Sequence, residues 1–405
     1  MKDGVLKGRW AAVLAVVVAL VLVVAACGPA PAGTAATQKV VRIGSLEQLT
    51  GGAAAATAYA HQGQADYFEY ANDQELIPGV RIDYLWADTG LQVAQEISTY
   101  RKFLDQDVPF ILAILSVEHF KKLVDKDHVP MLAYVPTADV IYPPGWLYAM
   151  YPTWAESFAV WGKWVMDNWK EDRPPKLALM GTDEVSGVRA LDEAIPYVES
   201  LGIEFLPTEY VGWVPIDSTT QLLRLAQQEV DYVFICPIWT TALPILRDAE
   251  RLGLTDQIKF AGLENTQSVG MIEALGPALD GYTAPRTVPW YEETEIPGIQ
   301  LLHELRQRGG SGLGYQGDDS HPVVAAAIAV EAVRRAIEDV GYENLDGAAV
   351  KAALDSFDDF DVYGLVQISY TPEDHRGWNK ARVYQVKDGK VMPASDWMEA
   401  PMIKE

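Results

Sequence analysis

Positive charge is scarce in this sequence, and its scarcity excludes one class of function. The 405 residues include 32 basic and 56 acidic side chains, which gives a formal net charge of −24. Because nucleic-acid binding depends on Lys and Arg contacts to phosphates, we expect no nucleic-acid partner. The excess of carboxylates indicates solubility, and it leaves open a preference for cationic or neutral ligands.

Catalytic and metal-binding motifs are also missing. The chain has no G-x-S-x-G elbow, no H-E-x-x-H pair and no phosphate-binding P-loop. The glycines of "RGGSGLGYQGDDS" follow a helical pattern, whereas a dinucleotide fingerprint follows a strand, so this stretch predicts a loop. The six histidines lack ligand spacing; they are His61, His119, His128, His303, His321 and His375. We therefore expect no metal, no cofactor and no enzymatic activity.

The first residues have the pattern of a secretory signal. Lys2, Lys7 and Arg9 precede an uncharged run of Ala, Val and Leu over residues 11–26. This run is shorter than the roughly 20 apolar residues that span a bilayer, which disfavours the alternative of a retained membrane anchor. Residues 1–26 are therefore predicted to be a signal peptide.

The signal ends in Val24-Ala25-Ala26-Cys27, which matches the lipobox of bacterial lipoproteins. We expect Cys27 to become the lipidated N-terminus, followed by a flexible tether of Gly, Pro, Ala and Thr over residues 27–38. The remaining thiol, Cys236, cannot form an internal disulfide and is expected to be a buried small hydrophobic residue. The mature protein should be extracytoplasmic and attached to a membrane by its lipid.

Strand-like and helix-like segments alternate after the tether. The first series places strands at 39–46, 80–88, 108–116 and 129–137, with helices at 56–74, 91–107 and 117–127. Such alternation predicts a parallel sheet with helices on both faces. The prolines of "YPPGWLYAMYPTW" interrupt regular structure, and a second alternating series then begins.

The second series predicts another α/β lobe. Its strands are expected at 176–181, 203–211, 231–239 and 258–264, and its helices at 156–172, 187–202, 217–230, 242–254 and 271–276. Asp217 or Ser218 is a candidate N-cap, and Gly202 is suited to end a helix. The fold class is thus α/β, with two doubly wound parallel-sheet lobes.

The last third of the chain offers two long helices, at 296–310 and 321–341, and a hairpin around Asp388-Gly389. These elements have too little sheet for a third domain and are expected to return to the earlier lobes. The predicted division is residues 39–150 plus 286–357 for lobe 1 and residues 151–285 plus 358–405 for lobe 2. Repeated crossing between lobes predicts a hinge, with the cleft between the lobes as binding site.

This order of elements, together with several local motifs from Val41 to Met392, resembles periplasmic binding proteins of the leucine/isoleucine/valine type. "LTGGAAAATAYAHQGQADYFEYAN" is similar to the opening of that family, with Thr50-Gly51 as the turn, then Gly63 and Asn72. The resemblance implies the type I periplasmic binding protein fold and the role of substrate-binding component of an ABC importer.

The resemblance also implies ligand-binding positions in lobe 1. The family's carboxylate-binding serine corresponds to Ser116, and two further contacts correspond to Val135 and Thr137. A hydroxyl at the start of a helix can hold a carboxylate together with unpaired backbone N–H groups. For Ser116 and Thr137 a simple capping role remains an alternative.

In lobe 2 the resemblance places an aromatic contact at Ile238, next to Trp239, and an acid for the ligand ammonium at Glu264. The chain departs from the family at two positions: Ala56 and Val185 stand where the family has ligand-binding tyrosines. Because both replacements are smaller, we expect the ligand to differ from leucine, with a larger, aromatic or amine-bearing ligand as one possibility.

The sequence therefore predicts a monomeric lipid-anchored solute-binding protein that captures an amino acid or related small molecule. Its expected partners are that ligand, an ABC permease and the membrane that holds the anchor. Two alternatives stay open at this point: a ligand-sensing lipoprotein for a signalling partner, and an anchored extracellular hydrolase.

Overall fold

The computed structural model describes residues 38–51, 54–114, 117–134, 137–309, 317 and 319–403. The predicted signal peptide, Cys27 and all of the tether except residue 38 lie outside these residues. Residues 40–405 group into one unit, within which two sheets are organised separately. Among the described helices, none is long and apolar enough to cross a membrane.

The first sheet has five strands in the order β2-β1-β3-β4-β5. Its strands are β1 (Lys39–Glu47), β2 (Val80–Asp88), β3 (Ile111–Ala113), β4 (Met131–Ala133) and β5 (Leu147–Ala149). Strand β3 pairs in parallel with β1 and with β4, and β4 pairs in parallel with β5. The predicted parallel sheet is thus confirmed, and β5 lies within the proline-rich stretch that was expected to lack regular structure.

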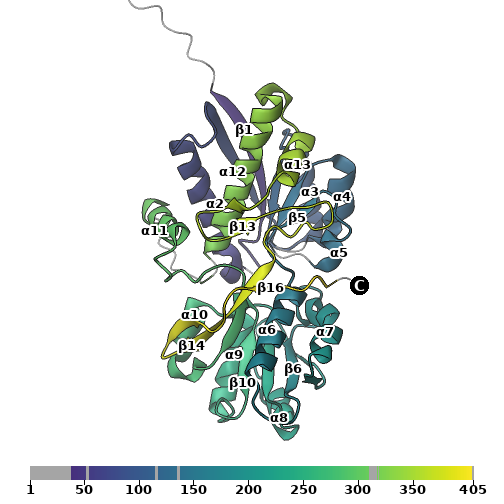
Figure 1. The fold of residues 1–405 in the computed structure, drawn as a ribbon, viewed down its shortest axis with the longest axis vertical. Helices are drawn as coiled ribbons and strands as arrows, with labels where there is room; N and C mark the ends of the chain where they lie inside the picture. The colour runs from purple at the N-terminus through teal and green to yellow at the C-terminus, as the bar shows by residue number, and fades with distance from the viewer. Residues whose placement is uncertain are drawn as a thin grey trace, which may run out of the picture. The chain divides into compact units, whose positions relative to one another are not determined.

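Helices cover both faces of this sheet. They are α2 (Ala54–Asp73), α3 (Val93–Leu104), η1 (Glu118–Phe120), α4 (Lys121–Asp127), α5 (Ala138–Ile141), α11 (Pro297–Gly309), α12 (Ser320–Val340), η5 (Tyr342–Asn344) and α13 (Gly347–Asp355). Helices α2, α11, α12 and α13 share one buried cluster, and α3, α4 and α5 share another. Figure 1 shows α12 lying along the sheet beside α2 and α13.

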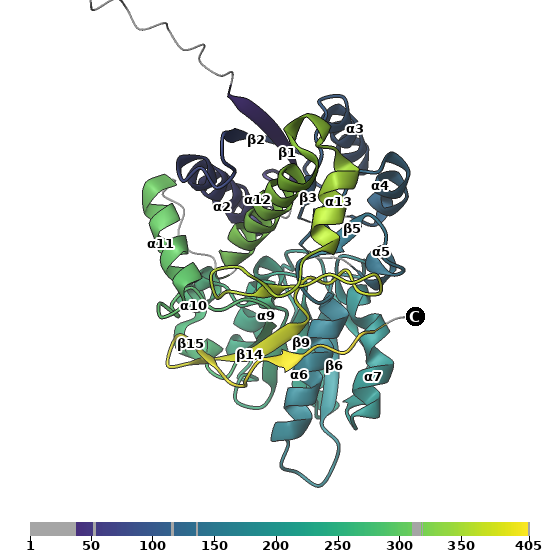
Figure 2. The ribbon, with the colours of Figure 1, turned by 45° about the horizontal axis from the view of Figure 1, so that its top comes forward.

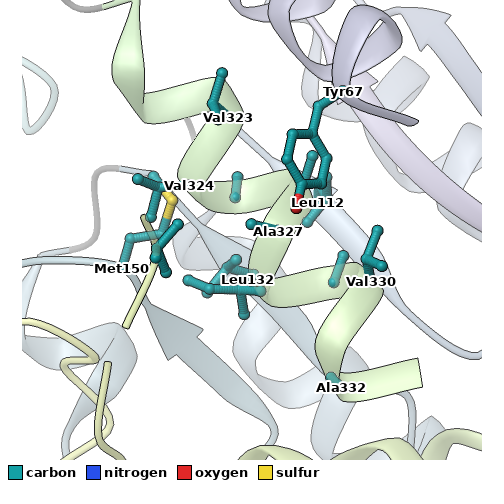
Figure 3. Close-up of a cluster of buried hydrophobic side chains, with 14 of the residues drawn as sticks. Tyr67, Leu112, Leu132, Met150, Val323, Val324, Ala327, Val330 and Ala332 are labelled. Carbon is teal, nitrogen blue, oxygen red and sulfur yellow. The ribbon is translucent and has the colours of Figure 1, made fainter. Parts of the chain in front are cut away.

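Alternate residues of the strands contribute side chains to the two buried clusters on opposite faces of the sheet. Leu112 and Leu132 join the cluster around α12, whereas their neighbours Ile111 and Met131 join the cluster around α3 and α4. This follows because successive strand residues point to opposite faces, and a sheet covered twice is apolar on both. Figure 3 shows Val324 and other α12 side chains packed over Leu112 and Leu132.

The second sheet has the order β15-β14-β11-β10-β9-β6-β7, with β16 paired to β14 and β8 paired to β6. Its strands are β6 (Lys176–Gly181), β7 (Glu204–Phe205), β8 (Glu209–Tyr210), β9 (Tyr232–Cys236), β10 (Lys259–Gly262), β11 (Thr283–Arg286), β14 (Lys380–Lys387), β15 (Lys390–Pro393) and β16 (Met398–Glu399). The strands β7, β6, β9, β10 and β11 pair in parallel, and β14 joins β11 in antiparallel fashion.

The helices of this half also lie on both faces of their sheet. They are α6 (Trp154–Asn168), η2 (Val188–Ala194), α7 (Ile195–Ser200), α8 (Thr219–Gln227), α9 (Trp239–Arg251), η3 (Glu264–Thr266), α10 (Val269–Leu275) and η4 (Gly276–Leu279). One cluster contains α8, α9 and α10, and the other contains α6, η2 and α7. The predicted fold class, two doubly wound lobes, is therefore confirmed.

The C-terminal segments return to both halves. Helices α12 and α13 pack on the first sheet, while β14 and β15 form the predicted hairpin on the edge of the second (Figure 2). Asp388 and Gly389 have φ values of +52° and +71°, as a two-residue turn of the I′ type requires. The hairpin prediction is confirmed.

The small sheet of β12 (Phe360–Asp361) and β13 (Gln367–Ile368) precedes β14. Val362, Leu365 and Ile368 belong to the cluster around the first sheet, although residues 358–405 were assigned to lobe 2. The division into lobes stays a prediction, and this packing favours a last crossing nearer to residue 379.

Two predicted elements of the second lobe are broken by proline. The expected helix at 187–202 is a 3-10 segment followed by α7, and Pro196 stands at the start of α7, where no N–H partner is needed. The expected strand at 203–211 is divided into β7 and β8 on either side of Pro207, because proline cannot donate to the ladder.

Candidate functional site

In each sheet, two neighbouring strands begin connections that run in opposite directions. In the first sheet these are β1 and β3, and in the second they are β6 and β9. Helices that follow such strands lie on opposite faces and leave a crevice at the carboxyl ends, where α/β proteins bind ligands. The residues at these ends are therefore the candidates for a functional site.

The carboxyl edges of the two sheets are joined by a buried hydrogen-bonded group. Glu264 follows β10, and its carboxylate accepts hydrogen bonds from the Thr287 backbone N–H at 2.8 Å and from the Thr287 hydroxyl at 2.9 Å. The Thr287 hydroxyl also lies 3.0 Å from Nε2 of His321, at the start of α12. His321 packs against Tyr151, just after β5, with ring centroids 4.9 Å apart. These contacts connect η3 of the second lobe to α12 and β5 of the first.

Arg286 holds the backbone next to this group. Its guanidinium is fully buried and donates to the carbonyl oxygens of Glu264, Gln267 and Gly317 at 3.3, 3.4 and 2.6 Å. It also lies over the ring of Trp290, 4.9 Å from the centroid. A buried cation with carbonyl and aromatic partners fixes loop positions, so Arg286 orients the segment that carries Glu264.

A buried charge pair lies where the chain crosses into α6. Thr153 and Glu156 form a capping box, with the Thr153 N–H donating to Glu156 at 2.9 Å. Glu156 also pairs with Arg376 at 2.9 Å and accepts from the backbone N–H of Ile403 at 3.2 Å. Desolvation by burial raises the pKa of Glu156, and the positive charge of Arg376 opposes that rise. The first turn of α6 is thereby tied to the C-terminal segment.

The structure places the predicted lobe 2 residues in different environments. Ile238 is buried at the N-cap position of α9, and Trp239 is the first residue of that helix. Glu264 is 4% exposed and its carboxylate is bound by Thr287, a contact that sequence reasoning did not predict. Val185 lies in an exposed turn, 53% accessible. Their roles in ligand binding stay predictions.

Of the predicted lobe 1 residues, only Thr137 can be described fully. It occupies the N-cap position of α5, but its hydroxyl donates to the Asp139 carboxylate at 2.5 Å instead of accepting from a backbone N–H. Ser116, Val135 and the side chain of Ala56 lie outside the described residues. Ala56 belongs to α2, and α2 contacts α9, the helix that begins at Trp239.

A buried polar cluster in lobe 1, formed by Gln48, Thr89, Glu96 and His119, was missed by the sequence analysis. The Thr89 hydroxyl donates to Glu96 at 3.4 Å, and Nε2 of His119 lies 3.3 Å from the other Glu96 oxygen. Burial raises the pKa of Glu96 to about 7; the charge of Glu118 adds to the rise, and interactions with Thr89 and Gln48 oppose it. Burial lowers the pKa of His119.

This cluster lies at the carboxyl edge of the first sheet. Gln48 directly follows β1, Thr89 follows β2, Glu96 stands in the first turn of α3 and His119 belongs to η1, which follows β3. One signal could have found it: polar residues directly after consecutive strands of a parallel sheet meet at one edge.

Glu47 and its partners lie beside this cluster. The carboxylate accepts from the hydroxyls of Ser45 at 2.7 Å and Tyr84 at 2.6 Å, and burial raises its pKa despite these bonds. Tyr84 also contacts Gln64 at 3.0 Å, whose amide donates to Tyr134 at 2.6 Å. This network connects the end of β1 to α2 and to the end of β4.

Several buried polar atoms near the carboxyl edges have no hydrogen-bond partner among the described residues. They are Nε1 of Trp154, Oγ1 of Thr182, Nε1 of Trp239, Oγ1 of Thr240, both amide atoms of Gln267 and Oγ of Ser320. Buried polar groups in proteins are almost always hydrogen-bonded, so a concentration of exceptions calls for an explanation. Neutral donors and acceptors of this kind can bind a small polar molecule.

A family model described as "Periplasmic binding protein" matches residues 40–390. The chain belongs to this family. The predicted resemblance is confirmed at this level, and it assigns the chain to a family of extracytoplasmic solute-binding proteins, which is not a family of enzymes. No curated protein sequence matches the chain.

Several solved structures share the fold of this binding protein. A branched-chain amino acid ABC transporter protein from Thermus thermophilus with bound valine has a TM-score of 0.83 and 23% identity, covering 90% of this chain and 98% of its own. An ABC transporter substrate-binding protein from Aeropyrum pernix has a TM-score of 0.80 and 19% identity, covering 91% and 100%. A fatty acid ABC transporter substrate-binding protein from Thermomonospora curvata has a TM-score of 0.77 and 18% identity. The match covers 91% of this chain and 94% of that protein.

Two cavities of the binding protein lie apart from these polar groups. One of about 520 Å³ is lined by Ala138, Asp139, Tyr142, Pro143, Pro144, Pro372 and Glu373. Another of about 580 Å³ lies over the exposed loop around Val214 and Ile216. Within the described part of the chain, no three His, Cys, Asp or Glu side chains are arranged to hold a metal ion.

Proposed function

We propose that this protein is a monomeric, extracytoplasmic solute-binding lipoprotein of an ABC importer. It captures an amino acid or a related small polar or aromatic compound between its lobes and delivers it to a permease. The observation that carries the proposal is the set of buried polar atoms near the carboxyl edges of both sheets that have no hydrogen-bond partner among the described residues. Closure of the lobes over the ligand would be a shift of population toward the state that binds better.

The solved relatives support this function and leave the ligand open. One has bound valine and another belongs to a fatty acid transporter, so proteins of this fold serve ligands of different chemical classes. We propose that Ser116, Val135 and Thr137 bind the ligand from lobe 1 and that Ile238, Trp239 and Glu264 bind it from lobe 2. Small residues at Ala56 and Val185 would enlarge the site.

The ligand-binding function is tested by a thermal-shift screen with amino acids, amines and aromatic acids. A cognate compound at 100 times its dissociation constant stabilises the native state by about 2.7 kcal/mol, so its addition should raise the unfolding temperature. The compound should be recovered unchanged by mass spectrometry after long incubation, which separates binding from hydrolysis. A panel in which no compound shifts the transition contradicts the proposal.

The lipoprotein part of the proposal has its own test. Lipidation at Cys27 together with removal of residues 1–26 should place the protein in the membrane fraction and add a diacylglyceryl group to the N-terminal peptide. Cys27→Ser should move the protein to the soluble fraction without changing ligand affinity, since the tether of residues 27–38 separates the anchor from the lobes. A membrane-bound Cys27→Ser protein would show that something else anchors the chain.

A further inference from the structure

The polar cluster of Gln48, Thr89, Glu96 and His119 has more hydrogen-bonding capacity than the described residues use. Gln48 and Glu96 are fully buried, and the Gln48 side chain interacts with Glu96, yet neither amide atom of Gln48 nor Oε2 of Glu96 has a well-aligned hydrogen-bond partner among the described residues. Nε2 of His119 has none either, although it lies 3.3 Å from that Glu96 oxygen. A buried amide whose donor and acceptor both lack well-aligned hydrogen bonds lowers the stability of the native state.

The charge around the cluster has one sign. The carboxylate of Glu118 contributes to the raised pKa of Glu96, and the carboxylate of Asp88 contributes to the raised pKa of Glu47. Of the Lys and Arg side chains that the structure describes, none forms an ion pair with Glu47, Glu96 or Glu118. A region with buried carboxylates and no paired cation attracts a positively charged group.

The available atoms match a nitrogen cation. Oε2 of Glu96 and Oε1 of Gln48 are acceptors, and Nε2 of a neutral His119 can serve as a third. An ammonium offers three donors and a guanidinium five, whereas a methyl or carboxylate group would leave these acceptors unpaired. Burial lowers the pKa of His119, which keeps its imidazole neutral and able to accept.

We propose that Gln48, Glu96 and His119 form a subsite that binds an ammonium or guanidinium group of the ligand. This proposal rests on the proposed function and specifies its substrate class: a small molecule with a cationic nitrogen in addition to any α-ammonium. The site lies at the end of β1 and the starts of α3 and η1, positions to which the family resemblance assigned no ligand contact.

Binding of a cation to this subsite releases a proton. Free Glu96 has a pKa raised to about 7 by burial, and an ammonium beside it favours the carboxylate form. The titratable groups that face Glu96 are Glu118 and His119, while Thr89 and Gln48 are neutral. Near pH 7 the bound complex should therefore hold fewer protons than the free protein and ligand.

The test compares L-lysine, L-arginine and 1,5-diaminopentane with L-norleucine, which has the four side-chain carbons of lysine but lacks the terminal ammonium. Titration calorimetry is run near pH 7 in two buffers of different ionisation enthalpy, because only proton release makes the measured heat depend on the buffer. At least one cationic probe should bind at least tenfold more tightly than norleucine and release protons.

Glu96→Gln should weaken that probe by 10- to 100-fold, leave norleucine within twofold and abolish the buffer dependence. Gln48→Met, which keeps the side-chain length, should weaken the probe by 3- to 10-fold and serves as the second variant. Glu69→Gln, an exposed acid of the same lobe, is the matched control and should change neither ligand. Circular dichroism confirms that each variant is folded.

Failure of this proposal is distinguishable from failure of the proposed function. If Glu96→Gln weakens lysine and norleucine equally, or if only uncharged compounds raise the unfolding temperature, the cation subsite is overturned and solute binding stands. If no compound of any class binds, the proposed function itself fails.

Discussion

Glu264 is buried after β10, and a buried carboxylate is stable only where partners replace the water it loses. Thr287 supplies both a backbone N–H and a hydroxyl, and His321 lies 3.6 Å away. The carboxylate thus joins the two lobes whether or not it also meets a ligand ammonium. At the scale of single residues, Glu264 therefore has a structural role that does not depend on its proposed contact with a ligand.

Thr287→Val tests the structural role. The substitution keeps the side-chain shape and the backbone N–H bond to Glu264. It removes the Thr287 hydroxyl, which contacts the Glu264 carboxylate and Nε2 of His321. We expect a loss of about 1–3 kcal/mol in the free energy of unfolding, measured by urea denaturation. The exposed Thr220→Val is the control, and equal stability of both variants would show that the Thr287 hydroxyl contributes nothing.

Glu96 predicts a pH dependence of stability. Its pKa is about 7 in the native state against an ordinary value of 4.5, so the native state binds the proton more tightly than the unfolded state. The contribution of Glu96 to the free energy of unfolding is fully present below about pH 4.5. This contribution, about 3 kcal/mol in total, is lost as the pH rises through 7. Glu96→Gln should flatten the decline in unfolding free energy between pH 5 and 8. A decline of unchanged slope would contradict the assignment.

At the scale of elements, long periodic segments were predictable and short interrupted ones were not. The helix at 321–341 and the Asp388-Gly389 hairpin could be predicted because amphipathic period and turn chemistry act locally. The three-residue strand β5 could not, since it forms by pairing with β4 and through a bridge from Ala149 to Arg376, between flanking prolines. Likewise, the polar cluster around Glu96 depends on which strand ends become neighbours, a tertiary property.

The first turn of α6 gives an element-scale prediction. Arg376→Met would leave Glu156 buried without its cation, which should cost about 3–5 kcal/mol of unfolding free energy. The double variant Glu156→Gln with Arg376→Met should recover a large part of that loss, because it removes the unpaired charge. Additive losses in this double-mutant cycle would show that the two side chains are not coupled.

At the scale of the whole molecule, the proposed function requires that the carboxyl edges of both sheets supply polar atoms to one small-molecule site. Polar groups of the first lobe gather around Gln48 and Glu96, and those of the second around Thr182, Trp239 and Gln267. Contacts from Glu264 through Thr287 to His321 hold the edges together.

Hydrogen–deuterium exchange with and without the compound that most raises the unfolding temperature tests this account most directly. We predict slower exchange in the ligand complex at both edges, in peptides that contain Gln48, Glu96 and His119 and in those that contain Thr182, Trp239 and Gln267. Protection confined to one lobe, or centred on the cavity beside Tyr142 and Pro372 or on the loop around Ile216, would contradict a ligand site formed by both carboxyl edges.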